Sequence, residues 1–159
     1  MERAGVKSGE PLAAIELRRA AAGDAAEISV VAQSSPGAAS WSEQQFLDAI
    51  SGNCENWVAV ADGDIAGFLF ARVAADEAEI LNMGVTAAIR RRKVGARLLD
   101  AAVRFARARG AKRMFLEVRE SNGAAIAFYR WAGFKESGQR PRYYSNPTED
   151  ARLLTLNIK

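Results

Sequence analysis

A basic stretch, Ile89–Leu99, constrains the fold of this chain more than any other segment. It reads Ile-Arg-Arg-Arg-Lys-Val-Gly-Ala-Arg-Leu-Leu and follows an apolar, strand-like run that ends at Val85. The apolar spacing that follows predicts a helix over Gly95–Arg109, so the stretch joins a strand to a helix. A helix N-terminus presents free amide groups and a partial positive charge. Gly95 and Ala96, among cationic side chains, therefore predict a seat for a pyrophosphate group.

The length of 159 residues and the apolar content of 49% are typical of one globular domain. We expect a flexible lead-in over residues 1–14 and a single domain over residues 15–159. Cys54 is the only cysteine, which fits a reducing compartment, and we expect the cytoplasm. No apolar run reaches the roughly 18 residues that a membrane span needs, so we expect no membrane partner. The expected oligomeric state is a monomer or a weak dimer.

The chain contains no histidine. This excludes the Ser-His-Asp and Cys-His designs of nucleophilic catalysis, and it removes the usual zinc sites. We therefore expect no metal ion. Any chemistry has to come from carboxylates, tyrosine, lysine and the backbone.

Positive charge is concentrated around the predicted helix. Ten Lys and Arg residues but one acid, Asp100, lie between Arg90 and Arg113, although the net charge is only +3. Such a block is either a solvated helix face or a binding surface for an anionic partner. Stacking aromatic residues are not interleaved with these cations, which disfavours direct binding of nucleic acid.

The remaining pattern predicts alternating strands and helices, with antiparallel hairpins at both ends of a mixed α/β fold. Strands are predicted at 15–18, 57–61, 65–73, 77–85, 114–118, 134–139 and 153–158. Helices are predicted over 24–33, from a capping box at Ser42 and Gln45, over 95–109, and from Asn122 to Gly133. The polar segment 140–150, which holds Pro141 and Pro147, is expected to be a loop.

Glu117 and Tyr129 are the candidate chemical groups. Glu117 is the one charge within the apolar strand Met114–Val118, which is expected to be buried on both faces. It either forms a salt bridge with Arg113, Arg119 or a loop arginine, or it is a general base that faces a ligand cleft. Tyr129 is either a core aromatic or a proton donor. A carboxylate base, a phenolic acid and a pyrophosphate seat together suit acyl transfer from a thioester to an amine.

Two segments resemble the GNAT acetyltransferase superfamily. Its Gln/Arg-x-x-Gly-x-Gly/Ala signature is similar to Arg90–Gly95, where Lys93 replaces the first glycine. Basic residues there can still face a pyrophosphate if the backbone avoids a positive φ. The segment Leu116–Phe134 carries LEVRxSNxxAIxxYxxxGF, a pattern similar to that of N-terminal acetyltransferases, above all those that acetylate the alanine of a small-subunit ribosomal protein. The likeness runs from Ile15 to Ile158.

The resemblance implies a twisted, mixed and mostly antiparallel sheet of six to seven strands with about four helices. The sheet is implied to open as a V between the strand that ends at Val85 and the one that ends at Val118, and acetyl-CoA fills the gap. Glu117 then matches the general base of the family and Tyr129 its general acid.

The resemblance also implies binding residues. Those for the cofactor are Met83, Gly84, Val85, Arg91, Arg92, Lys93, Val94, Gly95, Ala96 and Asn122. Those for the acceptor substrate are Trp41, Arg142, Tyr143 and Tyr144.

The predicted function is acetyl-CoA-dependent acetylation of a protein N-terminus, with the N-terminal alanine of a ribosomal protein as the acceptor. One alternative keeps the fold and acetyl-CoA but changes the acceptor to a lysine side chain or a small amine. Another is a different class of protein, namely a basic nucleic-acid-binding module or a catalytically silent acyl-CoA sensor.

Overall fold

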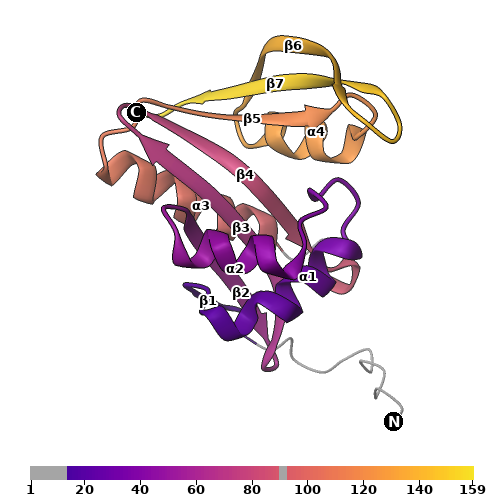
Figure 1. Cartoon of the computed structure of the whole chain (residues 1–159). Coiled ribbons are helices and arrows are strands. Elements are labelled where there is room, and N and C mark those ends of the chain that lie inside the picture. The colour runs from indigo at the N-terminus through magenta and orange to yellow at the C-terminus, as the bar shows by residue number, and fades with distance from the viewer. Residues whose placement is uncertain (1–13, 90–92) are drawn as a thin grey trace.

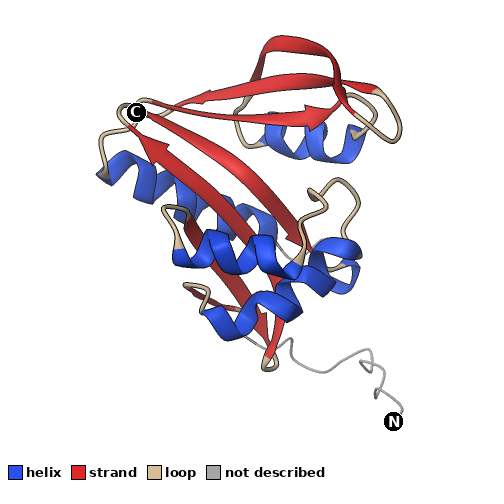
Figure 2. Cartoon of the chain, viewed as in Figure 1, coloured by secondary structure: helices blue, strands red, loops and turns tan. Residues whose placement is uncertain are grey.

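The computed structural model of the protein describes residues 14–89 and 93–159. Over these residues, seven strands form a single sheet in the order β1-β2-β3-β4-β5-β7-β6, and four α-helices pack on it (Figures 1 and 2). The strands are β1 Glu16–Arg18, β2 Glu55–Ala61, β3 Asp64–Ala74, β4 Glu77–Val85, β5 Arg113–Arg119, β6 Lys135–Tyr144 and β7 Glu149–Asn157. The helices are α1 Ala25–Gln33, α2 Glu43–Ser51, α3 Val94–Ala108 and α4 Gly123–Trp131, with short 3₁₀ turns at Ala22–Asp24 and Ala87–Ile89. The predicted fold class and element order are confirmed.

The helices cover both faces of the sheet. Helices α1 and α2 lie on one face of strands β2 and β3, and α3 lies on the other (Figure 1). Helix α4 packs on the same face as α3, because Tyr129 belongs to the core cluster that contains Val94 and Leu98 of α3. Each face of the sheet therefore has its own apolar cluster. The cluster beneath α1 and α2 contains Phe46, Phe68 and other buried aromatic residues.

The helix caps and turns predicted from local sequence motifs are present in the structure. The Ser42 hydroxyl accepts a hydrogen bond from the backbone N–H of Gln45, and the side-chain oxygen of Gln45 accepts one from the backbone N–H of Ser42, as in a capping box. Asp62 and Gly63 both adopt positive φ angles, 53° and 79°, in the tight turn between β2 and β3. Helix α3 ends before Gly110, whose φ of 85° suits a residue without a side chain.

Strands β4 and β5 separate after a short parallel contact. They pair only at three positions, from Glu77 with Arg113 to Glu79 with Phe115. Leu81 is an extra residue in the ladder between β3 and β4, because Phe70 pairs with Asn82 while Ala71 pairs with Ile80. A bulge of this kind bends its strand and increases the local twist. The rest of β4 therefore follows β3 away from β5, and the sheet opens as a V, as predicted.

The prediction of a loop over residues 140–150 was wrong. Strand β6 continues to Tyr144 and β7 begins at Glu149, so most of this polar segment is sheet. Pro141 is tolerated because β6 lies at the edge of the sheet and its register is irregular between Arg140 and Tyr144. An edge strand carries little apolar alternation, which is why the sequence pattern missed it.

The prediction that β5 is buried on both faces was also wrong. Met114, Leu116 and Val118 are buried, whereas Phe115 and Glu117 on the opposite face are only half-buried. Phe115 still pairs with Glu79 of β4, whereas Glu117 lies beyond the last β4–β5 pair, where the sheet has opened. Glu117 thus lies at an opening in the sheet instead of inside a continuous layer.

Gly84 fixes how β4 packs on the α1 side. A Cβ atom on Gly84 would lie 2.8 Å from Cε1 of Phe68 and 3.0 Å from Oγ of Ser35. Phe68 is fully buried among other aromatic rings and has no room to move. Glycine at this position therefore lets β4 lie close to β3 and to the α1–α2 loop.

We expect Gly84→Ala to lower the free energy of unfolding by about 1–3 kcal/mol, the usual cost of overpacking a core. Urea denaturation measures this change. Gly23→Ala is the matched control, since a Cβ atom there meets nothing within 4 Å. Equal urea midpoints for Gly84→Ala and the wild type would contradict this account of the packing.

Candidate functional site

The V between β4 and β5 contains a cleft of about 800 Å³. Its walls come from the α1–α2 loop, from the diverging strands, from α4 and from the end of β6. The lining residues are 36–41, 79–83, 116–119 and 143–145, together with Asn122, Ala125 and Tyr129. The cleft therefore brings together segments from both halves of the sheet.

Glu117 lies on the β5 wall of the cleft and is held by two groups from β6. Its Oε1 atom is 2.7 Å from Nε of Arg140, and its side chain is 15% exposed. A hydrogen bond with Glu117 and partial burial raise the pKa of Tyr143, so that phenol stays protonated. Of the partners considered from the sequence, Arg113 pairs with Glu77 and Arg119 with Glu149. A cationic amine that enters the cleft meets a carboxylate already paired with one cation.

Tyr129 is at once a core aromatic and a cleft residue. Its side chain is only 7% exposed and packs edge-to-face on the ring of Phe134, 5.4 Å away. Its hydroxyl donates to the Sδ atom of Met83 on β4 at 3.4 Å. Burial strongly raises the pKa of Tyr129, so the hydroxyl keeps its proton at neutral pH. Because a thioether is a weak acceptor, this proton is available to a better partner in the cleft.

The first turn of α3 lies behind Met83. Gly95 faces both Met83 and the next helix, since a Cβ atom on it would lie 3.2 Å from Cε of Met83 and 3.5 Å from Cζ of Phe128. Val94 is fully buried and anchors the turn in the core. The amide groups of a first helical turn have no partner within the helix, so this turn can bind an anion.

Lys93 is the N-cap residue of α3, directly before the first turn. The expectation from the sequence requires the backbone there to avoid a positive φ, and Lys93 does not meet that condition. Its φ is 61°, in the left-handed region, where glycine is favoured. The lysine occupies the place of the signature glycine with the same kind of backbone conformation, at a cost of about 1–2 kcal/mol. Arg91 and Arg92, the other predicted pyrophosphate residues, lie outside the described residues.

The other predicted cofactor residues are divided between the cleft and the core. Asn122 lines the cleft and caps α4 by accepting a hydrogen bond from the backbone of Ala125. Gly84 instead faces Phe68, and its neighbour Val85 accepts a hydrogen bond on its carbonyl from Ser35. Ala96 faces a second hollow, on the side of α3 that faces α4.

The predicted acceptor residues lie mostly in the cleft. Trp41, Tyr143 and Tyr144 line it, and Trp41 also packs on buried aromatic rings. Burial and the neighbouring Glu117 raise the pKa of Tyr144 to about 12. Arg142 is not part of the described lining, because the chain turns there with a φ of 53° and its backbone donates to Asp150.

Two residues of the site were missed from the sequence. Asn82 is 4% exposed, and its side-chain amide forms two hydrogen bonds with the backbone of Ala39, which fix the α1–α2 loop over the cleft. A polar residue inside an apolar strand was the available signal, as it was for Glu117. Arg140 carried no such signal, because it fell within the predicted loop.

A profile of the Acetyltransferase (GNAT) family matches residues 12–134 of the chain. The [ribosomal protein bS18]-alanine N-acetyltransferase of Salmonella typhimurium is 37% identical over 120 residues, which cover 74% of this chain and 81% of that protein. The chain belongs to the GNAT acetyltransferase family. The resemblance inferred from residues 90–95 and 116–134 is thereby confirmed.

Solved structures of GNAT proteins share this fold. The crystal structure of the ribosomal-protein-S18-alanine N-acetyltransferase from Escherichia coli aligns with a TM-score of 0.82 and 30% identity, covering 92% of this chain and 95% of that one. The PaiA N-acetyltransferase from Thermoplasma acidophilum, in complex with coenzyme A, aligns with a TM-score of 0.76 and 21% identity, covering 91% and 99%. The second likeness concerns the fold alone.

GNAT enzymes take the acetyl group from acetyl-CoA, and the residues present fit that substrate. Over the described residues, β4 has no strand partner on its β5 side after Glu79, so its backbone can pair with an extended pantetheine arm as it would with another strand. The first turn of α3, with Gly95 beside Met83, offers amide groups to a diphosphate at the end of that strand.

Two other kinds of site are absent from the part of the chain that the structure describes. Within residues 14–89 and 93–159, no helix has the length and the apolar character needed to cross a membrane. Over the same ranges, no three of the acidic and cysteine side chains converge in a way that would hold a metal ion.

Proposed function

We propose that this GNAT acetyltransferase transfers the acetyl group of acetyl-CoA to the N-terminal α-amine of a protein, and that its acceptor is the N-terminal alanine of ribosomal protein bS18. The observation that carries the proposal is that Glu117 and Tyr129 line one cleft, and that the Tyr129 hydroxyl contacts Met83 on the strand that can pair with pantetheine. The names of the relatives that are 30–37% identical support the choice of acceptor. Such an acceptor also supports a cytoplasmic location.

In the proposed mechanism, Glu117 receives the proton of the acceptor ammonium. The ammonium replaces the Arg140 guanidinium beside the carboxylate, which keeps the charge of the site balanced. The free amine attacks the thioester carbonyl carbon, so a C–N bond forms as the C–S bond breaks. Tyr129 donates its hydroxyl proton to the departing thiolate, and the proton that the new amide nitrogen releases restores the phenol. That hydroxyl already donates to a thioether sulfur on β4, the strand on which the pantetheine arm is proposed to lie.

The binding roles follow the walls of the cleft. We assign the pantetheine arm to the backbone of Met83–Val85 and to Asn122. The diphosphate is assigned to the first turn of α3, which contains Val94, Gly95 and Ala96, and to the basic residues Arg91, Arg92 and Lys93. The acceptor is assigned to Trp41, Tyr143 and Tyr144, with Arg142 at the outer rim.

We expect Glu117→Gln to lower kcat/KM by about 10²–10⁴-fold, the usual contribution of a general base. It should also flatten the acidic limb of the pH–rate profile, because the amide cannot become protonated as the carboxylate does. Steady-state rates across pH measure both effects. Glu120→Gln is the matched control, since Glu120 pairs with Arg152 outside the cleft. An acidic limb that survives in Glu117→Gln would assign the base to another group.

We expect Tyr129→Phe to lower kcat by about 10²-fold or more, because the thiolate loses its proton donor. The ring still packs on Phe128 and Phe134, so the melting temperature and the Kd for coenzyme A should change little. Single-turnover kinetics and calorimetry separate the two effects. A kcat equal to that of the wild type in this variant would show that Tyr129 has only a structural role.

The acceptor class is tested with paired peptides. We expect acetyl transfer to a peptide that begins with alanine and has a free α-amine, and to intact bS18. The control is the same peptide with a blocked α-amine and a free lysine side chain. Mass spectrometry locates the acetyl group. Transfer to the blocked peptide alone would show that the acceptor is a lysine side chain and not an N-terminal amine.

A further inference from the structure

Arg140 reaches the Glu117 carboxylate from two strands away. Its Nε atom lies 2.7 Å from Oε1 of Glu117, although Arg140 belongs to β6 and Glu117 to β5. Strand β7 lies between them, and Ala151 of β7 is the register partner of Arg140. Neighbouring strands lie about 4.8 Å apart, so the guanidinium crosses the width of β7 to meet the carboxylate. Ala151 leaves room for this crossing, because its side chain is a single methyl group.

The β6–β7 ladder is interrupted directly after Arg140, where residues 141–143 face Asp150 alone. The carboxylate of Asp150 accepts hydrogen bonds from the backbone N–H of Arg142 at 2.9 Å and from the side chain of Gln139 at 3.1 Å. These bonds tie the bulge to β7 on both sides of Arg140. A fixed backbone thus carries a side chain that is itself 56% exposed.

A second ion pair at the cleft follows directly from strand pairing, unlike that of Arg140. Glu79 also lines the cleft, and one of its carboxylate oxygens lies 2.6 Å from the guanidinium of Arg72. Glu79 and Arg72 are direct partners in the β3–β4 register, where opposite charges commonly pair. Arg140 pairs within the β6–β7 ladder and Glu117 within the β5–β7 ladder, so they are not opposite each other. The sheet register alone therefore does not account for the contact between Arg140 and the proposed base.

The exposure of the two partners makes this ion pair easy to exchange. The Glu117 side chain is 15% exposed, so loss of its counter-ion would leave an unpaired charge at a largely covered position, which costs free energy. The guanidinium is accessible to water, and its Cζ atom lies 5.9 Å from the centre of the Tyr143 ring. Both surroundings suit a free cation. The carboxylate thus requires a cation beside it, and a cation other than Arg140 can meet that requirement.

The acceptor of the proposed reaction supplies such a cation. It enters as an ammonium, which carries the same charge as the guanidinium and can replace it beside Glu117 without leaving an unpaired ion. A neutral group, such as a hydroxyl, offers the carboxylate no charge in exchange. The contact between Arg140 and Glu117 therefore distinguishes charged amines from neutral groups.

We propose that Arg140 is a specificity-determining residue that competes with the acceptor ammonium for the Glu117 carboxylate, so that a cationic amine displaces it and a neutral group does not. This proposal rests on the role of Glu117 in the proposed function. Arg140 then weakens the binding of every amine acceptor by the strength of its own ion pair. In return, it keeps the carboxylate paired whenever no amine is bound.

The test compares a peptide that begins with alanine and has a free α-amine with its des-amino analogue, in which hydrogen replaces that amine. Calorimetry with saturating coenzyme A gives the Kd of each peptide. We expect Arg140→Gln to lower the Kd of the amine peptide by about two- to fivefold, which corresponds to the strength of an exposed ion pair. The Kd of the des-amino peptide should not change. Arg140→Lys keeps a competing cation, so its Kd for the amine peptide should lie between those of Arg140→Gln and the wild type.

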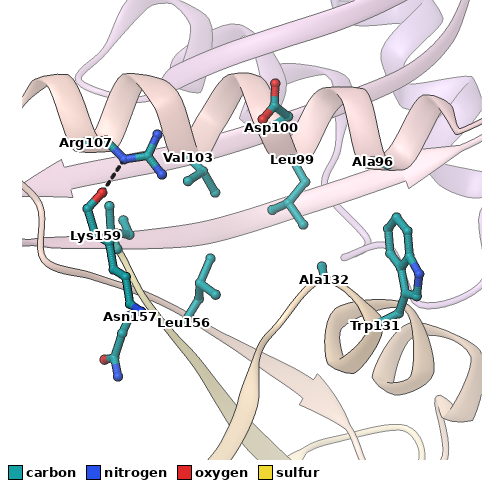
Figure 3. A pocket seen from close by; sticks show the side chains of 11 residues that line it. Ala96, Leu99, Asp100, Val103, Arg107, Trp131, Ala132, Leu156, Asn157 and Lys159 are labelled. Carbon is teal, nitrogen blue, oxygen red and sulfur yellow. Dashed lines mark hydrogen bonds between the residues drawn. The ribbon is translucent and has the colours of Figure 1, made fainter.

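Arg107→Gln is the matched control for the loss of one positive charge. Arg107 lines a second hollow, of about 510 Å³ between α3 and α4, and donates there to the carbonyl of Lys159 (Figure 3). The described lining of this hollow shares no residue with that of the cleft. The Kd of the amine peptide should therefore be the same in Arg107→Gln as in the wild type.

A double-mutant cycle tests whether the competition takes place at the carboxylate. In a Glu117→Gln background, Arg140→Gln should leave the Kd of the amine peptide unchanged, because no anion remains to compete for. The proposal is overturned if the Kd still falls in that background, if it falls equally for both peptides, or if Arg140→Gln alone has no effect.

These outcomes are distinct from failure of the proposed function. Each result that overturns the role of Arg140 leaves acetyl transfer intact, whereas failure of the wild type to acetylate any amine would remove the proposed function itself. If the wild type acetylates a lysine side chain instead, the same comparison uses a lysine peptide and its norleucine analogue, which lacks the ε-amine. The expected changes in Kd are then the same.

Discussion

The functional architecture depends on the early end of the β4–β5 ladder. The two strands pair at three positions and then diverge, because the bulge at Leu81 turns β4 along β3. Backbone groups that would pair within a continuous sheet face a cleft, and a peptide-like ligand can satisfy them. The packing of Gly84 on Phe68 and the two hydrogen bonds of Asn82 hold β4 and the α1–α2 loop in this position. The opening is thus a consequence of strand geometry and not of a missing element.

The two proposed catalytic groups are set apart by their surroundings. Glu117 lies at a half-open edge of the sheet, where an entering amine can reach its carboxylate beside Arg140. Tyr129 is buried among aromatic rings, and burial raises its pKa, which suits a phenol that keeps its proton until a thiolate forms. Because β5 and α4 are consecutive along the chain, one compact segment supplies both groups to the same cleft. The proposed mechanism thus assigns the acid to a phenol and the base to a carboxylate, in a chain without histidine.

Most of the fold followed from local sequence signals. Apolar alternation, the capping box at Ser42, the turn at Asp62 and the glycine after α3 each specify structure within a few residues, and the structure confirms them. The paired strands over 140–150 were missed because β6 is an exposed edge strand whose register against β7 is irregular. The one-sided burial of β5 was missed as well, since an apolar run such as Met114–Val118 does not tell which faces of the strand the rest of the fold covers.

The sequence alone determined the fold class and the family resemblance, and it singled out Glu117 and Tyr129 as candidate catalytic residues, because short motifs and periodicity are local properties of the chain. Only the tertiary structure decided what surrounds those residues. It paired Glu117 with Arg140 from a distant strand, turned the hydroxyl of Tyr129 toward Met83, and left Arg142 outside the described lining of the cleft. These contacts join residues that are far apart in sequence, and they depend on the register and twist of seven strands, which no single segment encodes.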